Sequence, residues 1–229
     1  MTPPDRPAAL EASPAKHDAA LRIVAVVASL AFVAMSVFVA KPGSNYRFSA
    51  LFLVPIVWGP YLLRRRIHLL PLHYVLFILA LLLHNLGAFG FYQRAFFGLS
   101  FDIYVHFYFG VVGALVLFRY LERTVPLTTW QLRFATVIII LGFGAVHELV
   151  EWFSTLLLGP KNGMLKTEGV YEFDTQRDMF DNLMGAIVAV TLYAWSRRAR
   201  RVRAESEDHA PAAQNADWRA AEPSIQSGP

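Results

Sequence analysis

Four groups of polar side chains stand out because each lies within, or at the end of, a long apolar stretch of the sequence. A charged side chain costs about 2.5–3.5 kcal/mol at the centre of a membrane helix, so such residues usually mark functional sites. Histidine, carboxylate and amide groups are also the types used in acid–base catalysis and in binding divalent metals. The groups are His84-Asn85, Asp102 with His106, His147-Glu148 with Glu151, and Asp174, Asp178, Asp181 and Asn182.

Within each group, the spacing places the side chains on one face of a helix. Asp102 and His106 are four residues apart, as are His147 and Glu151, and the acids of the last group recur at intervals of four and three. Residues three or four positions apart are neighbours on a helix surface. We therefore expect each group to project in one direction.

The apolar stretches predict an all-α integral membrane protein, a bundle of about six transmembrane helices. A bilayer core of about 30 Å needs roughly 20 mostly apolar residues per helix. The composition agrees, because 55% of the 229 residues are hydrophobic and only 17% are charged. The second stretch is short and contains two prolines, so its bounds are the loosest. The predicted spans are 21–40, 48–63, 69–90, 102–119, 132–157 and 178–196.

The basic residues predict the orientation of these spans. Of the 21 Lys and Arg residues, 15 lie before the first span, after each even span or in the C-terminal tail, and six lie on the other side. Basic residues favour the cytoplasmic side, so both termini are expected to be cytoplasmic. The ends of the third and fifth spans and the starts of the fourth and sixth then meet the outer leaflet. All four polar groups lie at these ends, which predicts one shared pocket facing outward.

The two ends of the chain are expected to be disordered cytoplasmic tails around a transmembrane domain of residues 21–197. Residues 1–20 are rich in Ala and Pro, and residues 198–229 are first basic and then acidic, without apolar periodicity. The chain has no Cys, which excludes disulfide scaffolds, thiolate metal sites and a cysteine nucleophile. Because the basic residues flank apolar stretches, they indicate topology and not nucleic-acid binding.

Three of the four polar groups also have a structural interpretation. The start of the sixth span has the Thr-x-x-Asp spacing of a helix cap, where acids are favoured by the helix dipole. Asp102 could be an acid at the water interface that is bonded to His106. His84 could be an interior histidine whose hydrogen bonds are satisfied. These alternatives remain open alongside the functional ones.

The segment from His147 to Glu151 has two ligand types at the spacing of a zinc-protease helix, but Glu151 replaces the second histidine of that motif. A divalent metal is the cofactor that this donor set suggests, completed by acids from another helix. Crowded carboxylates in a partly dry pocket could instead act as a general acid and base without a metal. The candidate metal ligands are His147, Glu151, Asp178 and Asp181.

The order of these motifs resembles two groups of bacterial membrane proteins over about residues 20–200. The VanZ-like pattern is carried by Asp102-x3-His106-Phe-Tyr-Phe-Gly, Glu148-x2-Glu151 and Asp178-x3-Asn182-x2-Gly185-Ala186. The closer similarity is to the YjdF family, through His147-Glu148-x2-Glu151-Trp152 and Tyr171-x2-Asp174-Thr175-Gln176-x-Asp178-Met179. The sequence departs from the VanZ-like pattern at Glu151, where those proteins often have Gln, and at His147, where they often have an acid.

The resemblance implies a helical bundle in the bacterial inner membrane. VanZ-like proteins are associated with glycopeptide resistance and have been suggested to act on lipid head groups or lipid-linked wall precursors. Membrane lipids are therefore the expected partners. A proton-coupled carrier and a non-enzymatic structural or stress-related membrane protein are the alternatives, although few polar residues line the inner half of the spans.

These observations lead us to expect an intramembrane hydrolase or transferase that acts on a phosphoester of a lipid head group. His106 would be the base or nucleophile and Asp102 would orient it. Glu148 and Asp178 would complete the catalytic set by moving protons or binding a metal. Gly185 would allow the sixth span to approach a neighbour closely. The residues expected to contact the substrate are His84, Asn182 and Arg177.

Overall fold

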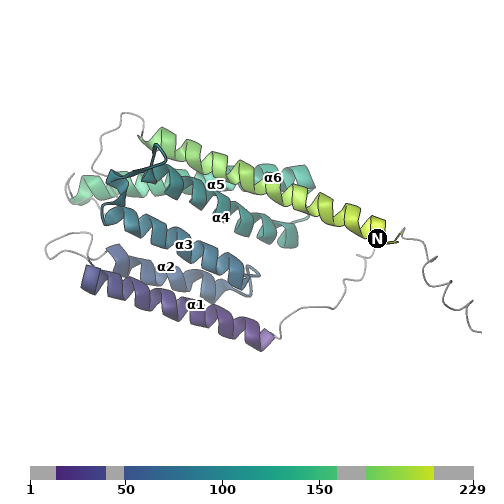
Figure 1. Ribbon diagram of the computed structural model, residues 1–229, viewed down its shortest axis with the longest axis horizontal. Helices are drawn as coiled ribbons and strands as arrows, with labels where there is room; N and C mark the ends of the chain where they lie inside the picture. Colours follow the sequence, from purple (N-terminus) through teal and green to yellow (C-terminus); the bar gives the residue numbers. More distant parts are fainter. Residues whose placement is uncertain (1–13, 40–48, 159–173, 209–229) are drawn as a thin grey trace, which may run out of the picture. The chain divides into compact units, whose positions relative to one another are not determined.

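The computed structural model describes residues 14–39, 49–158 and 174–208, which contain six α-helices (Figure 1). Each helix contains most of one predicted span. A short π-helical segment, η1 (Met35–Val39), follows the first helix. The helices are α1 (Pro14–Ala34), α2 (Ser49–Leu63), α3 (Pro71–Ala88), α4 (Phe101–Thr124), α5 (Thr129–Leu158) and α6 (Asp174–Asp208).

The helices extend further into the expected tails than the sequence analysis suggested. Residues 14–20 belong to α1 and residues 198–208 belong to α6, although both were assigned to disordered segments. Residues 14–20 contain three Ala and one Lys, and residues 198–208 contain four Arg, two Ala and two Glu. These residue types have high helix propensities, so a helix already formed by the apolar part can continue through both segments. The rest of the expected tails, residues 1–13 and 209–229, lies outside the described residues.

Three of the described helices are long and apolar enough to cross a membrane. These segments are Ala15–Phe38, Phe101–Thr124 and Thr129–Phe153. Two shorter apolar helices, Ala50–Leu63 and Pro71–Gly87, lie between the first and second of them. Many large apolar side chains on these helices are exposed, for example Leu30, Phe134 and Phe143. Exposed apolar surface on this scale indicates contact with lipid.

Helices α1, α2 and α3 share one hydrophobic core. Leu21 and Phe32 of α1 pack with Val57 of α2 and Tyr74 of α3, and all four are essentially inaccessible. The Tyr74 hydroxyl donates a 2.6 Å hydrogen bond to the carbonyl oxygen of Val57. That bond satisfies the one polar atom of a fully buried ring, and it joins α2 to α3.

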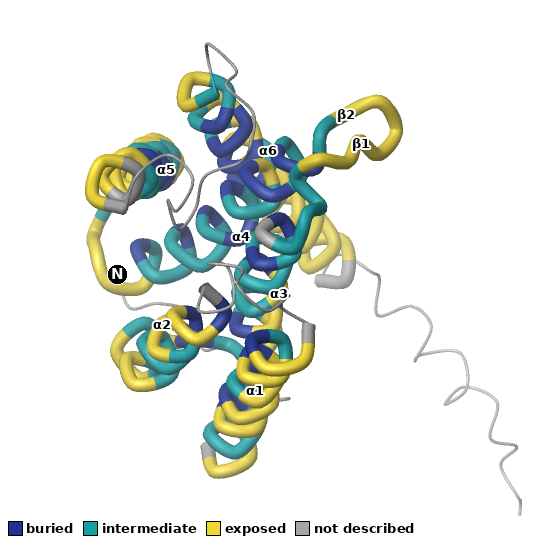
Figure 2. Tube along the Cα trace, turned by 90° about the vertical axis from the view of Figure 1, so that its left-hand side faces the viewer, coloured by how far each residue is buried: buried dark blue, intermediate teal, exposed yellow. Residues whose placement is uncertain are grey.

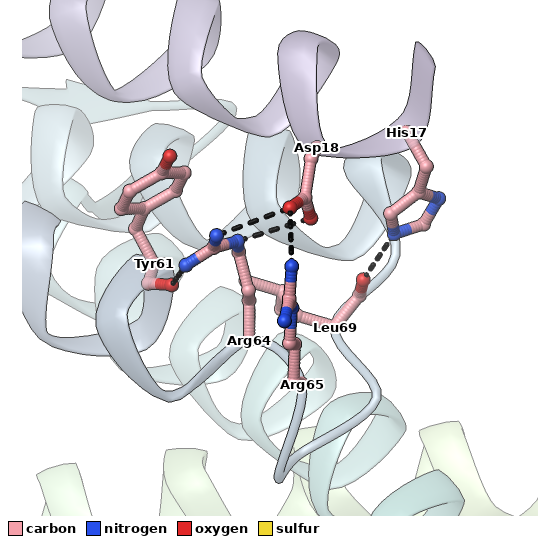
Figure 3. Close-up of polar contacts among 6 residues, drawn as sticks. All are labelled: His17, Asp18, Tyr61, Arg64, Arg65 and Leu69. Atoms are coloured by element: carbon pink, nitrogen blue, oxygen red, sulfur yellow. Dashed lines mark hydrogen bonds and ion pairs between the residues drawn. The ribbon is translucent and has the colours of Figure 1, made fainter. Parts of the chain in front are cut away.

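A polar network joins the start of α1 to the turn between α2 and α3 (Figure 3). Arg64 donates from Nε and Nη2 to the two carboxylate oxygens of Asp18, both at 3.1 Å. The guanidinium also lies 4.3 Å from the centroid of the Tyr61 ring. His17 Nε2 donates to the carbonyl oxygen of Leu69 at 2.9 Å. These contacts hold α1 against the α2–α3 turn.

A small hairpin that was not predicted connects α3 to α4. A 3-10 turn, η3 (Phe91–Gln93), is followed by the antiparallel strands β1 (Ala95–Phe96) and β2 (Leu99–Ser100). The two residues between the strands, Phe97 and Gly98, both have positive φ, at 53° and 78°. This is the backbone of a two-residue hairpin turn. The hairpin ends directly at the first turn of α4.

The ends of α3 and α5 and the starts of α4 and α6 lie at the same end of the bundle, at the left of Figure 1. This arrangement follows from the up-and-down order of the helices. It brings the four polar groups of the sequence to one level of the structure.

Candidate functional site

Three histidines from three helices form a continuous series of ring contacts. The His84 ring of α3 lies 5.4 Å from the His147 ring of α5, measured between centroids. The His147 ring in turn lies 5.9 Å from the His106 ring of α4. Both pairs meet nearly edge to face. The polar groups of α3, α4 and α5 therefore meet, as their positions in the spans led us to expect.

The first set of ligand-type side chains surrounds His106. His106 Nε2 lies 3.4 Å from Asp102 Oδ1 on the same helix and 3.7 Å from Asp178 Oδ2 on α6. All three residues are buried, and their ligand atoms lie within 4.8 Å of one another. Asp178 of α6 thus faces His106 of α4.

Asn182 contacts the opposite side of the His106 ring. Its Nδ2 lies 3.3 Å from His106 Nδ1, and only 1% of the residue is exposed. If Nδ2 donates this bond, Nε2 carries the ring proton and donates towards the two carboxylates. If the amide is turned so that Oδ1 accepts from Nδ1–H, Nε2 presents a lone pair as a base or metal ligand. The orientation of the Asn182 amide thus determines which ring nitrogen of His106 carries the proton.

The second set comprises His147, Glu148 and Glu151 on one face of α5. His147 Nδ1 lies 3.8 Å from Glu148 Oε1 and 3.9 Å from Glu151 Oε1. The ligand atoms of the three residues also lie within 4.8 Å of one another. A histidine with two carboxylates is a donor set suited to a divalent metal.

The structure divides the predicted metal ligands between the two sets. His147 and Glu151 belong to the second set, joined by Glu148, while Asp178 belongs to the first with Asp102. Asp181 is buried but belongs to neither set. Asp178 of α6 thus faces His106, and the candidate ligands of α5 face one another.

Several buried polar atoms of these residues have no hydrogen-bond partner among the described residues. Leaving such an atom unpaired costs about 1–3 kcal/mol. Clustered atoms of this kind indicate a place where water, an ion or a ligand group supplies the missing bonds. The atoms are His147 Nδ1, Glu148 Oε1, Asp178 Oδ1, Asp181 Oδ2 and Asn182 Oδ1.

Glycines allow the helices to approach closely around Asn182. A Cβ at Gly110 of α4 would overlap the backbone carbonyl oxygen of Asn182, and one at Gly185 would overlap the carbonyl oxygen of Phe107. A Cβ at Gly144 of α5 would lie 2.8 Å from Asn182 Nδ2. Gly185 therefore has the packing role expected of it. Gly110 of α4 and Gly144 of α5 likewise leave room for Asn182.

Tyr92 is a residue of the site that the sequence analysis missed. It lies in the η3 turn, and its hydroxyl is 2.9 Å from His84 Nδ1. Gly87 makes this possible, because a Cβ there would overlap the Tyr92 ring. A tyrosine in a connection carries no helical periodicity, so its position gave no signal. The Gly87 position next to His84 was the available clue.

Arg177 lies at the rim of the first set. Its Nη2 donates a hydrogen bond to the Oγ of Ser100, the residue that precedes the first turn of α4. This bond joins α6 to the end of the hairpin. The predicted substrate contact Arg177 is thus bonded to a residue that lies two positions before Asp102 in the chain.

Comparison with known proteins identifies the family. Residues 20–199 match the family described as predicted membrane protein (DUF2238). The inner membrane protein YjdF of Escherichia coli (strain K12) is 33% identical over 143 residues, which cover 57% of this chain and 68% of that protein. No solved structure matches the chain. The YjdF-type resemblance and the multi-pass inner-membrane location are therefore confirmed. The chain belongs to the DUF2238 family of predicted membrane proteins.

Proposed function

We propose that this chain is an intramembrane hydrolase or transferase that acts on the head group of a membrane lipid or a lipid-linked precursor. The observation that carries the proposal is the environment of His106. This histidine is buried, faces carboxylates from two helices and adjoins polar atoms that have no hydrogen-bond partner among residues 14–39, 49–158 and 174–208. Buried polar atoms of this kind are paired with water, an ion or a ligand group, and a lipid head group can take that place.

The proposed topology has six spans with both termini in the cytoplasm. The 15 basic residues on one side of the spans and six on the other support it. In this topology α6 is the sixth span, and the His/carboxylate cluster faces the outer leaflet. A lipid head group at that leaflet would reach the cluster without crossing the membrane.

His106 and Asn182 would activate the attacking group. With Asn182 Oδ1 accepting from Nδ1–H, His106 Nε2 would take a proton from water as its oxygen attacks the phosphorus of the phosphoester. The bond from phosphorus to the leaving alcohol oxygen would break, and that oxygen would receive a proton from the carboxylic acid of Glu148. In a transferase, an alcohol would replace the attacking water. Asp102 and Asp178 would stabilise the protonated His106 ring.

The second set would neutralise the phosphoryl oxygens if it holds a divalent cation. His147, Glu148 and Glu151 offer three ligand atoms close enough for one ion. Glu148 would then be a ligand of the ion, and the ion would supply Lewis-acid stabilisation of the negative charge on the leaving oxygen. Arg177 would attract the anionic head group towards the cluster. His84, whose ring contacts the His147 ring, would also contact the head group.

The test is lipid turnover by the purified protein in vesicles that contain bacterial phospholipids and a polyprenyl diphosphate. Products would be identified by mass spectrometry. We expect His106→Gln and Asp178→Asn to abolish turnover and His68→Asn to preserve it, since His68 is exposed and far from the cluster in sequence. His68 has a positive φ that Asn tolerates. Turnover that survives in both cluster variants would refute the proposal.

Two substitutions at Asn182 separate a positioning role from a merely structural one. Asn182→Asp keeps an oxygen that accepts from His106 Nδ1–H, whereas Asn182→Leu removes both bonding groups. We expect Asn182→Asp to retain part of the activity with a changed pH profile, and Asn182→Leu to lose it. Equal loss together with loss of folding in both variants would favour a structural cluster.

Metal content is tested separately by elemental mass spectrometry of the purified protein. A stoichiometric divalent metal that is lost in the His147→Ala, Glu151→Ala double variant would support a metal in the second set. Lipid turnover without any bound metal would instead support acid–base chemistry by the carboxylates alone.

A further inference from the structure

An apolar cavity of about 340 Å³ lies among α2, α3, α4 and α5, and the function proposed above does not use it. It is partly open, and its lining exposes only apolar surface. Pro60 of α2, Phe77 of α3, Val116 of α4 and Ile140 of α5 are among the lining residues. In Figure 2, α5 lies above and α2 below, both to the left of α4.

The cavity begins one helical turn away from the histidines of the candidate site. On each of three helices, the lining residue that comes nearest to the cluster lies three or four positions from a cluster histidine. One turn of helix is about 5.4 Å. The pairs are Ala80 with His84 on α3, Phe109 with His106 on α4, and Phe143 with His147 on α5. The polar site and the apolar cavity therefore adjoin along the same three helices.

The length of the cavity matches a hydrocarbon chain. Its lining on α4 runs from Phe109 to Tyr120, eleven residues later. At 1.5 Å per residue this is about 16 Å, roughly half of a 30 Å bilayer core. A lipid whose polar head group lies at the cluster would thus find beside it an apolar cavity long enough for a hydrocarbon chain.

We propose that this cavity holds one hydrocarbon chain of the lipid whose head group enters the His/carboxylate cluster. The inference rests on the proposed function and specifies its substrate class. Water is a poor occupant, because an apolar cavity offers it no hydrogen-bond partners. An irregular protein segment is also a poor occupant, because its backbone groups would be unpaired in hydrocarbon. A lipid chain has neither problem.

Chain binding in the cavity also explains how a site near the membrane surface would select lipids. Burying a hydrocarbon chain contributes about 0.8 kcal/mol for each methylene group when the alternative is water. A soluble phosphoester with the same head group would lack that contribution. The enzyme would therefore act on long-chain substrates in preference to short-chain analogues presented in the same detergent.

The first experiment maps the chain with a phospholipid that carries a photoactivatable diazirine in one acyl chain. Vesicles containing this lipid are irradiated, and labelled residues are located by mass spectrometry. We expect labelling of Ile140 and Val112, which line the cavity but are only 2% and 3% exposed. Label on the exposed face of α1 serves as the internal reference, since any lipid can reach it.

A matched pair of variants tests whether the label enters through the cavity. Ala80→Phe places a ring in the cavity, and Ala31→Phe adds the same ring to an exposed position of α1. We expect the ratio of Ile140 label to α1 label to fall severalfold in Ala80→Phe and to stay unchanged in Ala31→Phe. An unchanged ratio in a folded Ala80→Phe protein would overturn the inference. Should that variant fail to fold, absence of label at Ile140 in the wild type would overturn it equally.

The same preparations distinguish this inference from the function on which it rests. Cavity labelling together with turnover that falls in Ala80→Phe would support both. Cavity labelling without turnover of any lipid would support the chain site and refute the enzyme proposal. Turnover without cavity labelling would support the enzyme proposal and refute the chain site.

Discussion

The closest approach of α4 and α6 depends on glycine, and Gly110→Ala tests it. The new methyl group would overlap the backbone carbonyl oxygen of Asn182, and the carbonyl carbon would lie 3.0 Å away. A backbone carbonyl cannot avoid the overlap by changing rotamer as a side chain can, so the helices must separate. Overpacking of this kind costs about 1–3 kcal/mol. Against it, Ala stabilises a helix by about 0.5–1 kcal/mol relative to Gly, which leaves a net loss of up to about 2.5 kcal/mol.

The assay is thermal unfolding of the purified protein in detergent, followed by the fluorescence of its five Trp residues. For chains of this size, 1 kcal/mol changes Tm by about 2–4 °C, so we expect Gly110→Ala to unfold several degrees below the wild type. Asn182 would move with α6, and its contact with His106 would be lost. Lipid turnover should therefore fall even at temperatures where the variant remains folded.

Gly142→Ala is the matched control, because a Cβ at Gly142 of α5 would meet nothing within 4 Å. We expect it to unfold at the wild-type temperature or slightly above, through the higher helix propensity of Ala. Equal Tm values for Gly110→Ala and Gly142→Ala would refute the reasoning. In that case the α4–α6 distance would not be set by glycine.

Two further predictions concern other parts of the bundle. Gly87→Ala should displace the Tyr92 ring and break its hydrogen bond to His84, which would change the nitrogen chemical shifts of His84 in an NMR spectrum; unchanged shifts would show that the ring is held from elsewhere. Asp18→Asn should lower Tm slightly by removing the ion pair with Arg64, and the difference from the wild type should shrink as salt is added. A difference that is independent of salt would assign the effect to packing.

Much of this arrangement was predictable from the sequence because it rests on local patterns. Each predicted span corresponds to a helix, since apolar length and helical spacing are properties of continuous segments. The meeting of His84, His106 and His147 followed from the alternating direction of the spans. Spacing also placed Asp102 on the same face of its helix as His106, where the structure has it.

Contacts that depend on connections were not predictable in this way. Tyr92 reaches His84 through the η3 turn, and the β1–β2 hairpin sets the position of Ser100. Neither segment has a periodic pattern that would reveal which atoms it brings together. The turn residues Phe97 and Gly98 carried a weak signal, because Gly favours positive φ but Phe does not.

The sequence by itself determined that the chain is a multi-pass helical membrane protein whose histidines and acids gather at one end of the helices. Hydropathy and residue spacing are sufficient for this, because they act along single helices. Only the tertiary structure decided which acids face which histidine, and that Asn182 contacts His106. It also decided that an apolar cavity adjoins the site. These features depend on interhelical distances, which close packing at Gly110 and Gly185 sets and no single helix encodes.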